Sequence, residues 1–167
     1  MRLRLSAALA AALLMGACAV AGPRDIPNGS SSASVIGRMG PPSAEHVAAS
    51  GGRRLEYTGG TFGRFTWMFE FDAGDRLVNA EQVRDEPHFN AIQAGMGSRE
   101  VLARIGRPST TWPLSRQRQI VWSYRYDSPF CQWFMVGMGM DNRVVDTAYG
   151  PDPICDDDDF LRLRSVR

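Results

Sequence analysis

Residues 35–43 read Val-Ile-Gly-Arg-Met-Gly-Pro-Pro-Ser, and residues 101–109 read Val-Leu-Ala-Arg-Ile-Gly-Arg-Pro-Ser. The two stretches begin 66 residues apart and are identical at five of nine positions. Around the second stretch, the apolar residues of 98–105 fall on one face of a helix, which Gly106 and Pro108 would end. A pattern that recurs at a fixed distance indicates one structural unit present twice.

Each copy is followed by a region in which apolar and polar residues alternate, the period of a half-buried β-strand. Residues 65–72 carry aromatic rings at every second position, and residues 134–141 carry apolar side chains at the matching positions. Further strands are expected over 53–58, 77–83, 118–126 and 144–149, with hairpin turns at 73–75 and 141–143 and an additional helix over 87–94. We therefore predict an α+β fold of two repeated units, each with one or two short helices on a three-stranded antiparallel meander (ααβββ).

The start of the chain indicates export. Residues 1–17 combine a basic start, a short apolar run and small residues at the exit, as a signal peptide does. Cys18 follows Met-Gly-Ala, which resembles the lipobox of bacterial lipoproteins, so we expect Cys18 to carry the lipid anchor. By resemblance to enterobacterial sorting signals, Ala19 then favours the outer membrane. The alternative is cleavage after Ala21, which would release a soluble secreted or periplasmic protein.

Composition narrows the class of function. The 167 residues include 19 basic side chains, all of them arginine, and 18 acidic ones, for a net charge of +1. Such a balance lacks the basic surface that general nucleic-acid binding requires, so no nucleic-acid partner is expected. The expected segments are the signal peptide 1–17, the lipidated N-terminus and flexible tether 18–34, the first unit 35–86, the second unit 87–155 and the charged C-terminal tail 156–167.

Two cysteines follow the anchor, Cys131 and Cys155. An even number of cysteines in an oxidising compartment suggests a disulfide. A hairpin turn centred near Asn142 would set residue 131 opposite residue 153, close enough to Cys155 for a bridge. We therefore expect the two to be joined, and the alternative is two free thiols.

The second unit contains four motifs that together resemble the SmpA/OmlA (BamE) family of outer-membrane lipoproteins. They are Gly95–Val101, Ile105–Pro108, Trp122–Tyr124 and the turn Asp141–Val145. The family usually has threonine where Gly97 stands, and the first unit matches more weakly. The resemblance implies a non-enzymatic, lipid-anchored, periplasm-facing protein that binds an envelope protein such as a component of the β-barrel assembly machinery. A tandem of this fold also resembles the β-lactamase inhibitory proteins, so the alternative is a secreted protein inhibitor.

The sequence offers no arrangement of residues for catalysis. His46 and His88 lie one in each unit and outside any metal-binding spacing. The sequence contains no nucleophile elbow and no phosphate-binding loop of the usual kind. We therefore expect no catalytic residues, no metal ligands, no cofactor and no small-molecule substrate. The run Asp156–Asp159 could hold a divalent cation, although an acidic start to a short helix is the simpler interpretation.

Aromatic and arginine side chains are the usual anchors of protein interfaces. We expect Phe62, Trp112 and Trp133 to lie in exposed loops. Trp112, with Arg116 or Arg118 and with Phe62, is therefore predicted to contribute to a partner-binding surface. The alternative for Trp112 is that it covers the edge of the adjacent core.

Overall fold

A computed structural model describes residues 23–48 and 50–155. The predicted signal peptide 1–17, the predicted anchor Cys18 and the acidic run Asp156–Asp159 lie outside the described residues. Within the described part of the chain, no helix is long and apolar enough to span a bilayer.

The first half consists of one α-helix and a four-stranded antiparallel sheet. In chain order the elements are η1 (Pro23–Asp25), α1 (Ser32–Met39), β1 (Ala44–Val47), β2 (Arg53–Gly59), η2 (Thr61–Gly63), β3 (Phe65–Phe71) and β4 (Leu77–Gln82). The strands pair in the order β1-β2-β3-β4. α1 begins where the Ser31 hydroxyl accepts a hydrogen bond from the Ser34 amide, at 3.2 Å, and it ends at Gly40.

The second half repeats this order and adds one helix. Its elements are α2 (Glu86–Asn90), α3 (Ser98–Ile105), β5 (Thr110–Leu114), β6 (Gln119–Arg125), β7 (Gln132–Gly139), β8 (Val144–Pro151) and η3 (Pro153–Cys155). The strands pair in the order β5-β6-β7-β8. The residue before the helix bridges to the hairpin after the third strand in both halves, Ser31 to Arg76 and Gly97 to Arg143. The start of the helix is therefore attached to the same hairpin in both halves.

The predicted fold class was wrong, because each half is built on a four-stranded antiparallel sheet rather than on a three-stranded meander. The strands missing from the prediction are β1 and β5. β1 has only four residues, too few to show a period of two. β5 contains Pro113, which suggested a loop, but a proline is tolerated at the edge of a sheet where β5 lies.

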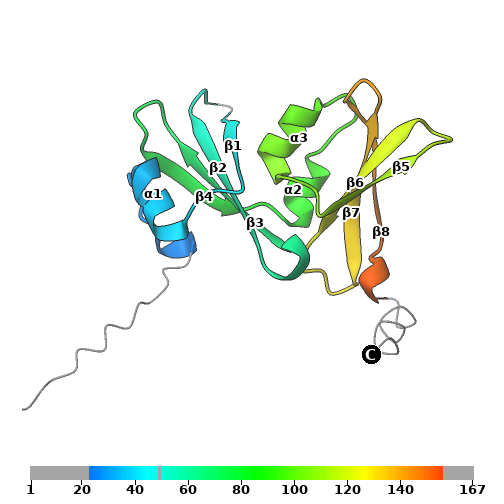
Figure 1. The fold of residues 1–167 in the computed structure, drawn as a ribbon, viewed down its shortest axis with the longest axis horizontal. Coiled ribbons are helices and arrows are strands. Elements are labelled where there is room, and N and C mark those ends of the chain that lie inside the picture. The colour runs from blue at the N-terminus through cyan, green and yellow to red at the C-terminus, as the bar shows by residue number, and fades with distance from the viewer. Residues whose placement is uncertain (1–22, 49, 156–167) are drawn as a thin grey trace, which may run out of the picture.

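The elements form layers, with α1 on one face of the first sheet and with α2 and α3 between the two sheets (Figure 1). The first core joins α1 to its sheet and includes Val35, Leu55, Phe69, Phe71 and Leu77. The second core joins α2 and α3 to their sheet and includes Phe89, Val101, Ile105, Phe134 and Val136. Because neighbouring strand residues point to opposite faces, each sheet also has a second face that does not pack on its own helices.

The two halves meet at a buried polar joint. Arg84, in the connection between β4 and α2, is only 2% exposed. It donates hydrogen bonds to Thr66 Oγ1 (3.0 Å), Ser109 Oγ (3.2 Å), the Arg125 carbonyl (3.4 Å) and the Arg107 carbonyl. Its guanidinium also lies 4.9 Å from the centre of the Tyr124 ring. Arg84 therefore joins the first sheet to two segments of the second half, the connection between α3 and β5 and the strand β6.

Glu56 forms the other part of this joint. It is completely buried on the second face of the first sheet, and it accepts a hydrogen bond from the Arg107 amide at 3.0 Å. His46 Nε2 lies 2.8 Å from its other oxygen. The end of α3 approaches so closely that a Cβ at Gly106 would lie 2.9 Å from Glu56 Oε1. Only glycine fits there, because Gly106 also has a φ of 76°.

Candidate functional site

A cleft of about 910 Å³ lies between the first sheet and the helices α2 and α3. Three successive residues of β1 line one wall, namely Glu45, His46 and Val47. The facing wall is formed by α2 and α3, with Pro87, His88, Ala91, Leu102 and Ala103. Both histidines of the chain therefore lie at the same cleft, although they are 42 residues apart in the sequence.

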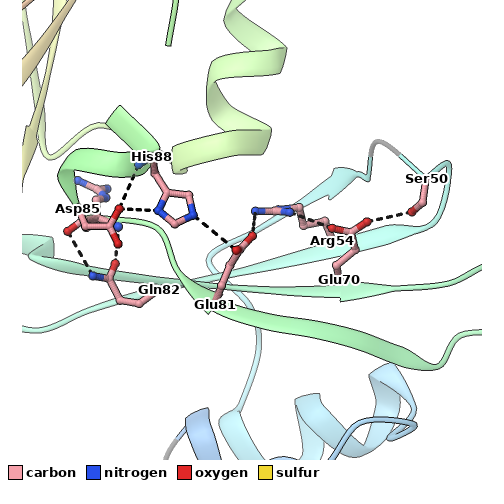
Figure 2. A network of polar contacts seen from close by, with 8 residues as sticks. Ser50, Arg54, Glu70, Glu81, Gln82, Asp85 and His88 are labelled. Atoms are coloured by element: carbon pink, nitrogen blue, oxygen red, sulfur yellow. Dashed lines mark hydrogen bonds and ion pairs between the residues drawn. The ribbon is translucent and has the colours of Figure 1, made fainter. Parts of the chain in front are cut away.

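A row of polar contacts runs along the sheet side of this cleft (Figure 2). The contacts are Ser50 Oγ to Glu70 Oε1 (3.0 Å), Arg54 Nη1 to Glu70 Oε2 (3.0 Å), Arg54 Nη2 to Glu81 Oε1 (3.0 Å), His88 Nε2 to Glu81 Oε2 (3.5 Å) and His88 Nδ1 to Asp85 Oδ1 (2.5 Å). Asp85 also accepts a hydrogen bond from the His88 amide at 3.1 Å, which caps the start of α2. The row thus ties β2, β3 and β4 to α2.

This arrangement is suited to binding and to holding the halves in place. Ser50 is the hydroxyl of the row, and it donates to Glu70 rather than to a histidine. Arg54 pairs with two carboxylates, those of Glu70 and Glu81, and its side chain is only 12% exposed. Within the described residues, no group of three or more His, Cys, Asp or Glu side chains is placed to hold a metal ion.

The buried side chains Glu56 and Arg84 of the joint remain ionised at neutral pH. Burial raises the pKa of Glu56, but contacts with His46, the Arg107 amide and Thr58 outweigh it and hold the pKa below the ordinary value of 4.5. Burial lowers the pKa of Arg84 to about 10, with Tyr124 and Glu56 opposing this effect. Glu56 and Arg84 are therefore both charged at neutral pH, whereas burial raises the pKa of Tyr124 and keeps its hydroxyl neutral.

A second candidate surface lies on the second face of the second sheet. The Trp112 and Trp133 rings stack with their centres 4.9 Å apart and their planes inclined by 26°. The Arg125 guanidinium lies 5.5 Å from the ring centre of Trp133 and 5.5 Å from that of Phe62. We call these four residues, Phe62, Trp112, Arg125 and Trp133, the aromatic face. Stacked rings and an arginine between rings form a rigid apolar surface.

A disulfide helps to fix the position of Arg125 in the aromatic face. Cys131 and Cys155 are joined, as predicted, with their Cα atoms 6.3 Å apart. The bridge closes a loop of the chain, and Asp152 lies near the end of that loop. The Asp152 amide donates a hydrogen bond to the Cys131 carbonyl at 3.0 Å. Its carboxylate accepts two hydrogen bonds from Arg125, at 2.7 and 3.1 Å. The covalent bridge thereby fixes the carboxylate that orients Arg125 between the two rings.

The structure brings some of the predicted interface residues together. Phe62 is 55% exposed and belongs to the aromatic face, while Trp112 is half-buried against Trp133. Trp112 and Trp133 were wrongly expected in exposed loops, because they lie in β5 and β7 and Trp133 is only 8% exposed. Arg116 and Arg118 are exposed in the turn between β5 and β6, at the far end of β6 from Arg125.

Sequence reasoning missed one residue of the aromatic face, Arg125, and the buried Asp152 that holds it. The two meet only through the fold, since they are 27 residues apart. The alternation Ser123, Arg125 along the strand did indicate that Arg125 shares a face with Ser123. No pattern in the sequence indicated that Asp152 would meet it.

Comparisons with known proteins show no family. No protein-family model matches the chain, and no curated protein matches it significantly. Two solved structures are similar: an extracellular protein containing an SCP domain from Bacillus anthracis (TM-score 0.28, 15% identity over 81% of this chain) and the DUF4309 family protein YjgB from Bacillus subtilis (TM-score 0.28, 12% identity over 74% of this chain). The chain spans 46% of the first and 79% of the second. At these TM-scores neither similarity supports a conclusion about this chain.

Proposed function

We propose that this chain is a non-enzymatic lipoprotein of the outer membrane that faces the periplasm and binds another envelope protein. The observation that carries the proposal is the aromatic face. It presents an exposed ring, Phe62, beside a tryptophan stack that an arginine and a disulfide hold in place. Rigid aromatic and arginine side chains of this kind give binding energy at little cost in conformational entropy.

The partner is expected to present acidic side chains next to an apolar patch. Arg116 and Arg118 are exposed in the turn between β5 and β6, on the same sheet as the aromatic face. Exposed positive charge at one end of the sheet that carries the aromatic face favours a partner with acidic side chains at the rim of its contact and an apolar centre. The disulfide agrees with an oxidising compartment such as the periplasm.

Two measurements test the proposal. The first is mass spectrometry of the mature protein, produced with its own leader in a bacterium that has an outer membrane. A diacylglyceryl group on Cys18 is expected. A mature protein that begins at Gly22 would instead support the secreted form and contradict the anchor.

The second measurement is partner capture by photo-crosslinking in the envelope, with a photoreactive amino acid at Arg116. Trp112→Ala is expected to reduce the crosslinked product about tenfold, because it removes one ring of the stack. Tyr149→Ala is the matched control, since Tyr149 is a partly exposed ring on the opposite face of the same sheet. If Trp112→Ala lowers thermal stability and leaves the crosslink unchanged, Trp112 only covers the core edge.

A further inference from the structure

The cleft follows the free edge of the first sheet. Within the described residues β1 pairs with β2 alone and lies at the end of the strand order. Neighbouring side chains of a strand point to opposite faces, so a cleft on one face would contact only every second residue. Glu45, His46 and Val47 all line the cleft. The cleft must therefore reach around the edge of β1, where backbone groups are free to pair.

The edge of β1 carries neither proline nor lysine. Strands at sheet edges are commonly blocked by proline or lysine. β5, which holds the corresponding position in the second sheet, contains Pro113. β1 contains neither residue, and its Val47 is 75% exposed. An apolar side chain on an unblocked edge is the arrangement that accepts an additional strand.

The opposite wall of the cleft is an apolar strip with one free charge. Leu102 and Ala103 of α3 are partly buried and face the cleft. Arg104 pairs with Glu100 at 3.0 Å, and Arg54 is paired as described above. Arg99 also lines the cleft, and its guanidinium makes no ion pair or hydrogen bond within the described part of the chain. The unpaired charge of the cleft is therefore positive.

We propose that this cleft binds an extended peptide segment of another protein, which adds to β1 as a fifth strand of the first sheet. Backbone hydrogen bonds to β1 supply affinity, as in other cases of strand addition. Alternate side chains of the peptide then face α3, where small apolar groups contact Leu102 and Ala103. An acidic side chain of the peptide pairs with Arg99. The site is separate from the aromatic face and does not depend on the function proposed above.

The test measures peptide binding to the whole folded protein by fluorescence anisotropy. The probes are labelled heptapeptides in which valine alternates with aspartate, threonine or lysine. The aspartate series is expected to bind most tightly because of Arg99. A second version of each peptide carries N-methyl groups on alternate amides, which removes the donors that pair with a strand but keeps the side chains.

Variants locate the site. Val47→Lys blocks the edge of β1, and Ala103→Arg fills the apolar wall; each is expected to weaken binding about tenfold or more. Val78→Lys is the matched control, because Val78 is 47% exposed on β4, at the other edge of the same sheet. Arg99→Glu is expected to reverse the preference from aspartate to lysine peptides. Its control is Arg38→Glu, the same charge change on the exposed side of α1.

Thermal unfolding of each variant shows that it is folded before binding is compared. The proposal predicts loss of binding with the N-methylated peptides and with both cleft variants, and wild-type binding for Val78→Lys. Equal affinity for methylated and unmethylated peptides would overturn strand addition. So would unchanged binding by Val47→Lys and Ala103→Arg, or no binding by any peptide up to about 1 mM.

Discussion

The two sheets have the same strand order but differ in their second faces. On the first sheet this face carries charged residues, Arg54 and Glu56 among them, and α2 and α3 lie over it. At the corresponding positions of the second sheet stand Val121 and Ser123, beside the stacked tryptophans. No described helix lies over that face (Figure 1). One scaffold thus carries an internal joint on one copy and, on the other, an aromatic face in which Phe62 is exposed and Trp133 is buried.

The difference shows how a duplicated unit can divide its tasks. The charged face is satisfied from within the chain, because Glu56 and Arg84 find their partners across the joint. A buried ion that loses its partner is expensive, so such a joint permits few alternative arrangements of the two halves. The aromatic face has no buried ion pair of the joint beneath it, and its Phe62 ring is 55% exposed.

The largest expected effect comes from removing the joint's arginine. Arg84→Met keeps an apolar side chain of similar length but leaves Thr66, Ser109 and two carbonyl groups without their donor. We expect a loss of about 3–5 kcal/mol in the free energy of unfolding, measured with urea. Arg38→Met, on the exposed side of α1, should change stability by less than about 0.5 kcal/mol. Equal effects of the two substitutions would mean that the joint does not hold the halves.

The next largest effect concerns the aromatic face. Replacing Cys131 and Cys155 by serine opens a loop of 24 residues and is expected to cost about 3.5 kcal/mol. Hydrogen exchange should rise in β7 and β8 more than in β2 and β3, because the first sheet has no such bridge. Uniform acceleration in both sheets would show instead that the halves unfold as one cooperative unit.

A smaller effect on stability distinguishes the two halves most directly, because it compares the same substitution at matching positions. Gly40 and Gly106 end α1 and α3 with similar φ angles of 81° and 76°. A Cβ at Gly40 would meet nothing within 4 Å, whereas one at Gly106 would lie 2.9 Å from Glu56 Oε1. Gly40→Ala should therefore cost only the backbone strain, about 1 kcal/mol. Gly106→Ala should cost about 2–3 kcal/mol, because it also displaces the joint.

The sequence predicted three of the four strands in each sheet but missed the edge strands β1 and β5. The helix at 98–105 was confirmed at the same bounds, because Gly106 and the spacing of Val101 and Ile105 are local signals. The turn near Asn142 also placed Cys131 within reach of Cys155, as the structure confirms. Predictions of this kind depend on residues that are close together in the chain. The allowed backbone conformations strongly restrict how such residues can be arranged.

The use of the second faces could not be predicted in this way. Around Leu55 and Tyr57, the alternating polar residues Arg54 and Glu56 resemble a solvent-facing side of a strand. Glu56 is nevertheless fully buried, because a segment 51 residues away donates its amide to it. Periodicity reports which residues share a face, but it does not report what covers that face.

The smallest expected effect is a pH dependence that belongs to the charged face alone. The folded protein holds the pKa of Glu56 below 4.5, so its carboxylate stabilises the fold above the unfolded pKa. This contribution is lost as the pH falls through the lower, folded pKa. In urea titrations between about pH 6 and pH 3, Glu56→Gln should flatten the decline in the free energy of unfolding relative to the wild type. The matched change on the other half, Asp152→Asn, removes the carboxylate that holds Arg125 in the aromatic face. A flattening as large for Asp152→Asn as for Glu56→Gln would place the acid sensitivity outside the joint.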